Sequence, residues 1–198
     1  MNMPRQLDQW LRSEETSQLL SVLLLLLTVV LLFTWTSNPS RSNDSWYSVT
    51  AVRLTGLGLF ATWAAVVASS SRTAEALSAW LVTALAAAVT VPFELVAFAA
   101  SYPAASLPGT MLFSFSFPLG RFGISWLLAR LFGRARWLAV PAVIALAAAL
   151  FMLDGLTGLQ LLSPVTIITS ERWALLLSWS LLALLTLIML LFGGRSDD

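Results

Sequence analysis

The chain contains no cysteine, no histidine and no lysine among its 198 residues. Without cysteine it has no disulfide bond, no thiolate nucleophile and no thiolate metal ligand. Without histidine it lacks the commonest general base and the imidazole ligands of zinc, copper and haem sites. Without lysine it has neither Schiff-base chemistry nor the lysine of a phosphate-binding P-loop. We therefore expect no enzyme activity and no resident cofactor or metal, so another subunit must supply any energy input.

Charge is also scarce. Charged residues make up 11% of the chain and hydrophobic residues 58%, whereas a soluble domain carries roughly 25% charged residues to keep its surface wetted. Most of the outer surface is therefore expected to face a lipid bilayer. All 11 basic residues are arginine, and with 10 acidic residues they give a net charge of +1. No basic patch has the density that nucleic-acid binding requires, so no nucleic-acid partner is expected.

Long apolar stretches are what the chain does contain. A helix needs roughly 20 mostly apolar residues, each rising 1.5 Å, to cross a bilayer. Six stretches qualify, at about residues 17–35, 49–68, 77–100, 111–131, 138–153 and 173–192. The sequence therefore predicts an all-α fold, a polytopic transmembrane helical bundle with about six spans that forms a single domain over residues 17–198.

Residues 1–16 show a different pattern. Leu7, Trp10 and Leu11 fall on one helical face, and polar residues occupy the rest. This spacing predicts an N-terminal interfacial amphipathic helix, with a frayed hydrophilic tail as the alternative. The apolar stretch that follows is longer than a signal-peptide core of about 7–15 residues and has no A-x-A site after it, so we expect it to be retained.

The placement of arginine predicts the orientation, because inner loops are enriched in basic residues. With the N-terminus inside, the inner segments hold seven arginines and the outer segments three. An even number of spans then puts both termini on the cytoplasmic side of a bacterial inner membrane. Arg130, Arg134 and Arg136 cluster between the fourth and fifth spans and are the strongest orientation anchors.

Four charged residues lie within the predicted spans, where insertion costs about 2.5–3.5 kcal/mol each. They are Arg53, Glu94, Arg121 and Asp154, the last of which ends its span and is interpreted as a boundary residue. Arg53 and Glu94 lie at similar depth in neighbouring spans, so an ion pair between them would neutralise both. Such a pair is either a gate or substrate contact on the outer side, or a structural ion pair. We favour the structural role; Arg53 snorkelling to the interface is a further alternative.

Arg121 lies nearer the middle of the bilayer, in the segment F-P-L-G-R-F-G that begins at Phe117. The proline and the two glycines weaken the helix where the charge sits. Arg121 therefore either lines a polar cavity and contacts an anionic headgroup or substrate, or is capped by carbonyls freed at a kink. The outer segment from Gly155 to Ser170 is apolar for a loop, which indicates either a re-entrant segment or a loop packed on the helix ends.

Taken in order, these features resemble the membrane subunits of ATP-driven exporters, the type-2 ABC permease family. The stretch G-I-S-W-L-L-A-R-L-F-G-R-A-R, from Gly123 to Arg136, is similar to the family's fourth span and the basic inner loop after it. The stretch L-L-S-P-V-T from Leu161 is similar to the Ser-Pro segment before the family's last span. The order of elements matches over nearly the whole chain.

The resemblance implies a permease subunit that forms a homodimer or heterodimer and couples to a separate nucleotide-binding ATPase subunit. Walls of Phe, Leu and Ala suit the export of a lipid-like or amphipathic substrate. In the family, the inner segment between spans two and three docks on the ATPase. Here that segment is short, from Ser69 to Glu75. Arg72 and Glu75 are its candidate coupling residues, and a solvated turn is the alternative.

Two other functions fit the same pattern. One is the substrate-binding membrane subunit of a vitamin uptake transporter, which also has about six spans and a separate ATPase. The other is a non-catalytic structural subunit that holds a larger membrane complex together. An intramembrane enzyme is disfavoured because histidine and lysine are missing.

Overall fold

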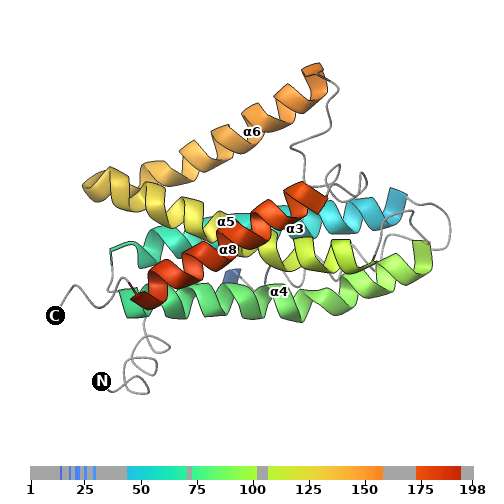
Figure 1. The fold of residues 1–198 in the computed structure, drawn as a ribbon, viewed down its shortest axis with the longest axis horizontal. Coiled ribbons are helices and arrows are strands. Elements are labelled where there is room, and N and C mark those ends of the chain that lie inside the picture. The colour runs from blue at the N-terminus through green and yellow to red at the C-terminus, as the bar shows by residue number, and fades with distance from the viewer. Residues whose placement is uncertain are drawn as a thin grey trace.

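The computed structural model describes residues 44–70, 73–101, 107–157 and 173–192, together with six helical residues between positions 14 and 29. The described part contains only helices and short turns, so the predicted all-α class is confirmed for it (Figure 1). The elements are α3 (Asp44–Ala68), α4 (Thr73–Ser101), α5 (Leu107–Phe132), the 3₁₀ helix η1 (Gly133–Leu138), α6 (Ala139–Thr157) and α8 (Trp173–Phe192).

Helix α5 lies at the centre of the bundle. It packs against α3, α4 and α8 and continues through η1 into α6 (Figure 1). Its contact with α8 depends on two glycines. A Cβ atom on Gly120 would lie 2.8 Å from Cε3 of Trp179, and one on Gly123 would lie 2.0 Å from Oγ1 of Thr186. Because no side chain fits at either position without displacement, these glycines let the two helices approach closely.

Small residues also fill the interface between α3 and α4. The buried cluster at the centre of the bundle contains Leu57, Phe60, Phe122 and Trp126, and its other members are mostly alanines. Alanine faces let helix backbones approach closely, as they do in membrane bundles. The buried alanines of this cluster on α3 and α4 are Ala61, Ala64, Ala65, Ala68, Ala76, Ala79, Ala86 and Ala87.

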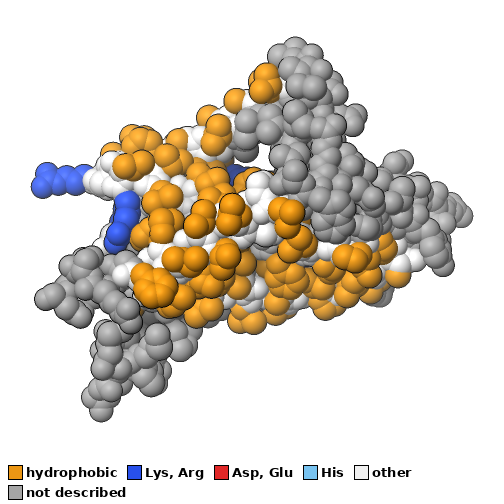
Figure 2. Space-filling model, viewed as in Figure 1, with side chains coloured by type: hydrophobic (Ala, Val, Ile, Leu, Met, Phe, Trp, Pro, Cys, Tyr) orange, Lys and Arg blue, Asp and Glu red, His pale blue; other side chains and the backbone are white. Residues whose placement is uncertain are grey.

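The outer surface of the bundle is apolar. Leu81, Leu85 and Val89 recur every four residues along α4 and are between 45% and 59% exposed. Figure 2 shows hydrophobic side chains over much of the described part of one face, with basic side chains at the end where α5 meets α6. A helix face of this kind is unfavourable in water and favourable against lipid. The exposed residues of α8 repeat the pattern and include Leu177, Leu181, Leu184, Leu185, Ile188 and Leu191.

Helix α6 diverges from the rest of the bundle after η1 (Figure 1). Its first turns are packed, because Ala139 is fully buried and Val143 is 5% exposed. Further along, Ile144, Leu146 and Met152 are between 44% and 67% exposed. This helix therefore presents apolar side chains to its surroundings along most of its described length.

Two stretches are long and apolar enough to cross a membrane, judged by length and composition: Thr73–Val96, and Leu107–Leu146, which includes the turn at η1. Val52–Ala68 and Leu177–Phe192 are shorter apolar helices. Helices thus occupy the second to sixth predicted stretches. Most of the first stretch and of the N-terminal interfacial helix lies outside the described residues.

The helices extend into segments that were predicted as loops, and α5 likewise begins at Leu107 rather than at about residue 111. Helix α3 begins with residues 44–48, which were predicted to belong to an outer loop. Glu75 was predicted in an inner loop but lies in the first turn of α4. Helix α6 ends with residues 155–157, which were predicted to start an outer loop. The reason is that polar residues end an apolar stretch without ending a helix. Carboxylates such as Glu75 are even favourable in a first turn, where they meet the positive end of the helix dipole. Residues 158–170 lie outside the described part.

Candidate functional site

The structure brings Arg53 of α3 and Glu94 of α4 together in a buried ion pair. The Arg53 Nη1 group contacts Oε2 of Glu94. Arg53 Nε donates a hydrogen bond to the Thr90 hydroxyl at 2.7 Å, and Nη2 donates one to the carbonyl of Ala87 at 2.8 Å. The guanidinium is therefore held by three acceptors on successive turns of α4.

Hydroxyl groups from α3 and α5 complete the environment of the Glu94 carboxylate. Thr50 of α3 donates to Oε1 of Glu94 at 3.3 Å, and Ser114 of α5 donates to Oε2 at 2.6 Å. Each of these polar side chains is at most 1% exposed. A buried pair of charges is tolerable only when its other polar atoms are also hydrogen-bonded, and here each guanidinium nitrogen and each carboxylate oxygen has at least one partner.

This network joins α3, α4 and α5 at one level. The structural ion pair proposed from the sequence matches the geometry, because Arg53 and Glu94 are both fully buried and contact each other. A role in gating stays a hypothesis. Sequence reasoning missed Thr50, Thr90 and Ser114. The spacing of Thr50 three residues before Arg53, and of Thr90 four residues before Glu94, was the available signal.

Arg121 occupies a separate polar position between α3 and α5. Its Nε donates to the Thr62 hydroxyl at 3.2 Å, and Ser125 donates to the same hydroxyl at 3.3 Å. The stem of Arg121 lies against Gly58, where a Cβ atom would come within 3.1 Å of Cδ. No carboxylate in the described part of the chain lies within 4 Å of this half-buried arginine. A threonine on the neighbouring helix, rather than freed carbonyls at a kink, holds its Nε.

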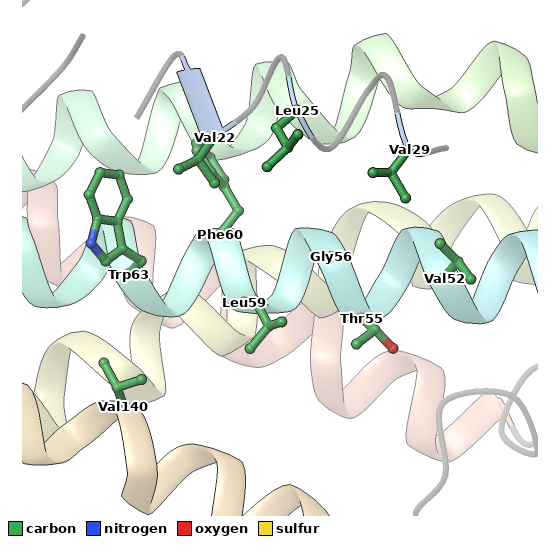
Figure 3. Close-up of a pocket in the computed structure, with 10 residues that line it drawn as sticks. All are labelled: Val22, Leu25, Val29, Val52, Thr55, Gly56, Leu59, Phe60, Trp63 and Val140. Carbon is green, nitrogen blue, oxygen red and sulfur yellow. The ribbon is translucent and has the colours of Figure 1, made fainter. Parts of the chain in front are cut away.

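An apolar pocket of about 710 Å³ opens beside α3 (Figure 3). Six residues of α3 line it, and Val140 of α6 and three residues of the N-terminal part complete it. Its polar side-chain groups, among the described residues, are the Thr55 hydroxyl and the Trp63 indole N–H. The volume and apolar walls match a ligand site for a hydrocarbon-rich molecule. The lining residues are Val22, Leu25, Val29, Val52, Thr55, Gly56, Leu59, Phe60, Trp63 and Val140.

The three predicted orientation anchors lie together at the other candidate site. Arg130, Arg134 and Arg136 line a pocket of about 670 Å³ with Ser69 and Ser70, which follow α3. Arg130 also lies over the ring of Trp126, with 4.5 Å from its guanidinium carbon to the ring centroid. The sequence pattern placed these arginines at one inner loop but not beside the end of α3.

Of the remaining predicted residues, Glu75 is the one whose side chain the structure describes. Arg72 lies outside the described residues. Glu75 is half-buried in the first turn of α4. Asp154 lies in α6, and its side chain is outside the described part. Within the described residues, no group of three or more acidic side chains comes together that would hold a metal ion.

No family model, no curated protein and no solved structure matches this chain. The features that bear on function are therefore the two pockets and the buried ion pair.

Proposed function

We propose that this chain is the permease subunit of an ATP-driven transporter of the ABC type, which exports a lipid-like or amphipathic substrate. It resides in a bacterial inner membrane with about six spans, an interfacial N-terminal helix and both termini in the cytoplasm. A separate nucleotide-binding subunit hydrolyses ATP, and two membrane subunits form the working transporter.

Helix lengths and surface chemistry support the membrane location. Helix α4 has 29 residues and α5 has 26, which correspond to about 43 Å and about 39 Å at 1.5 Å per residue. Both exceed the roughly 30 Å hydrocarbon layer of a bilayer. Leu81, Leu85 and Leu181 each leave more than half of their surface uncovered, whereas the ion pair is sealed inside. A lipid environment favours this arrangement, in which apolar side chains form the outer surface and charged side chains lie inside the bundle.

The pocket beside α3 is the observation that supports a lipid-like or amphipathic substrate. Its ten described lining residues are aliphatic or aromatic except for Thr55 and Gly56. The Arg53–Glu94 pair is buried elsewhere and saturated by its own partners. A hydrophilic ion or sugar would find few hydrogen-bonding groups in such a pocket, whereas an acyl chain loses nothing on entering it.

The same pocket separates this proposal from the vitamin uptake alternative. A vitamin carries several hydrogen-bonding groups, and a site that captures it needs matching polar side chains. Thr55 and Trp63 are too few for that role. The structural-subunit alternative draws its support from α6, whose exposed apolar side chains suit a neighbouring membrane protein as well as lipid.

The test of the substrate class uses a photoreactive phospholipid and a photoreactive fatty acid with the purified full-length chain in nanodiscs. We expect cross-links at the lining residues of α3, located by mass spectrometry of peptides. Leu59→Trp fills the pocket and should reduce labelling severalfold. Leu85→Trp, on the exposed face of α4, is the matched control. Equal labelling of both variants would reject the pocket as a substrate site.

The transporter assignment has its own test. The tagged chain is purified from its native membrane in mild detergent, and the copurifying proteins are identified. We expect a stoichiometric soluble partner with the motif G-x-x-x-x-G-K-[ST], whose ATP hydrolysis the lipid substrate stimulates. Recovery of membrane proteins alone would contradict the transporter and support the structural subunit.

A further inference from the structure

The corner where α5 turns into α6 gathers positive charge in one concave place. We propose that this corner binds the phosphate group of an anionic phospholipid on the inner side of the membrane. The site consists of Arg130, Arg134 and Arg136 with Ser69 and Ser70. The inference rests on the proposed membrane location, but it is independent of transport and of any ATPase partner.

Among the described residues, no acidic side chain neutralises the charge in this pocket. None of the described residues that line the pocket is acidic. Within the described part of the chain, Nη1 of Arg136 is buried and has no hydrogen-bond partner. A buried guanidinium N–H without an acceptor is costly, and a phosphate oxygen is the acceptor that fits it best.

Capping of the neighbouring helix end does not explain these arginines. At the end of α3, Ser69 and Ser70 already donate to the carbonyls of Val66 and Val67, at 2.7 Å and 3.1 Å. The backbone N–H of Ser69 also bonds to the carbonyl of Val66. The carbonyls of Val66 and Val67 thus have local donors and need no guanidinium to cap them.

The backbone of the corner sets the arrangement of the arginines. Gly133 has φ = +54°, a left-handed conformation at the end of α5. Arg134 and Arg136 follow it in η1, whereas Arg130 lies in the last turn of α5. Arg130 stacks on Trp126 and Arg136 lies 5.8 Å from the ring of Trp137. Stacking on rigid rings reduces the freedom that each guanidinium loses when it binds.

Apolar side chains beside the pocket indicate a lipid rather than a free anion. Leu131 is 81% exposed, Leu138 55% and Trp137 49%. They flank the basic pocket in sequence on both sides of the turn. A phospholipid presents a phosphate and acyl chains together, and this corner presents arginines and exposed apolar side chains together. A soluble phosphate would use only the arginines.

The test measures lipid retained by the purified full-length chain in native mass spectrometry, after reconstitution with equal amounts of phosphatidylglycerol and phosphatidylcholine. We expect the wild type to retain phosphatidylglycerol selectively. Arg134→Gln and Arg136→Gln should each weaken this binding about fivefold. Arg195→Gln, which removes a basic residue from the C-terminal segment on the same predicted side, is the charge-matched control. Melting temperatures of all variants establish that they are folded.

A second arm distinguishes the source of the phosphate. Inorganic phosphate is titrated, with chloride as the ionic-strength control, against the delipidated chain in detergent. Stabilisation by phosphate that Arg134→Gln abolishes, without selective lipid retention, would assign the pocket to a soluble phosphate and overturn the lipid proposal. Equal loss of lipid in Arg195→Gln and Arg134→Gln would show only diffuse attraction to the surface and would also overturn it. Failure of the ATPase search would leave this result unaffected.

Discussion

The hydroxyl oxygen of Thr186 on α8 lies only 2.0 Å from the point where a Cβ atom on Gly123 of α5 would be. The same hydroxyl donates a hydrogen bond to the carbonyl of Leu182 at 2.8 Å, which holds it in place. Glycine at position 123 is therefore a requirement of the helix contact rather than of backbone conformation. Through this contact α8, the last described helix, packs against α5 at the centre of the bundle.

Substitution Gly123→Ala should destabilise the chain by about 1–3 kcal/mol, because the added methyl group forces α5 and α8 apart. The measurement is the unfolding midpoint in detergent. Thr186→Ala removes the obstructing hydroxyl, so the double variant should recover part of the loss. Leu185→Ala, on the exposed side of α8, is the control and should have little effect. A tolerated Gly123→Ala would contradict the close approach.

Removal of one member of the buried ion pair should be far worse than removal of both. Glu94→Leu leaves Arg53 charged and unpaired between three helices, and we expect a loss of about 3–5 kcal/mol. The double variant Arg53→Met, Glu94→Leu should be more stable than Glu94→Leu alone. Unfolding in detergent measures both. If the double variant is stable but loses lipid labelling, the pair has a role beyond stability, as the gating hypothesis requires.

The turn between α5 and α6 should be sensitive to the residue at position 133. Gly133→Ala places a side chain at φ = +54°, which costs about 1–2 kcal/mol for an ordinary residue. Among the described residues other than its chain neighbours, none has an atom within 4 Å of the added Cβ, so the penalty is conformational rather than steric. Gly133→Asn should be milder, since asparagine adopts this conformation more readily. Equal effects of Ala and Asn would disprove this explanation.

The natural absence of cysteine makes the topology directly testable. Pro108 and Ala135 lie at opposite ends of the α5 segment and are both exposed. In whole cells, a membrane-impermeant maleimide should label Pro108→Cys but not Ala135→Cys. In inverted vesicles the labelling should reverse. The unmodified chain is the control. Labelling of both variants from the same side would contradict a membrane crossing by α5.

Much of the helical framework could be predicted from the sequence. Leucine and alanine runs such as those of α4 and α8 form helices in any apolar environment, because each backbone group finds its partner within the same segment. The pairing of Arg53 with Glu94 was also predictable, since two opposite charges at similar depth in neighbouring apolar stretches have few other ways to be neutralised.

The helix ends and the contacts between helices were not predictable in this way. Thr50, Thr90 and Ser114 are ordinary residues in their own helices, and only the crossing of α3, α4 and α5 brings their hydroxyls to one pair of charges. Composition says nothing about crossings, because many arrangements of apolar helices bury similar areas. The choice among them depends on local fit, such as the space that Gly123 leaves for Thr186.

The two pockets also separate what the sequence predicts from what the packing of the helices decides. Alone, the sequence determined that the chain is helical, apolar outside and basic between its fourth and fifth apolar stretches, because these properties follow from the residue types along each segment. The tertiary structure decided that the arginines of that loop face Ser69 and Ser70, and that α3 lines an apolar cavity with α6. Binding sites arise where residues from separate segments meet, and those meetings are set by packing between helices rather than by periodicity within one.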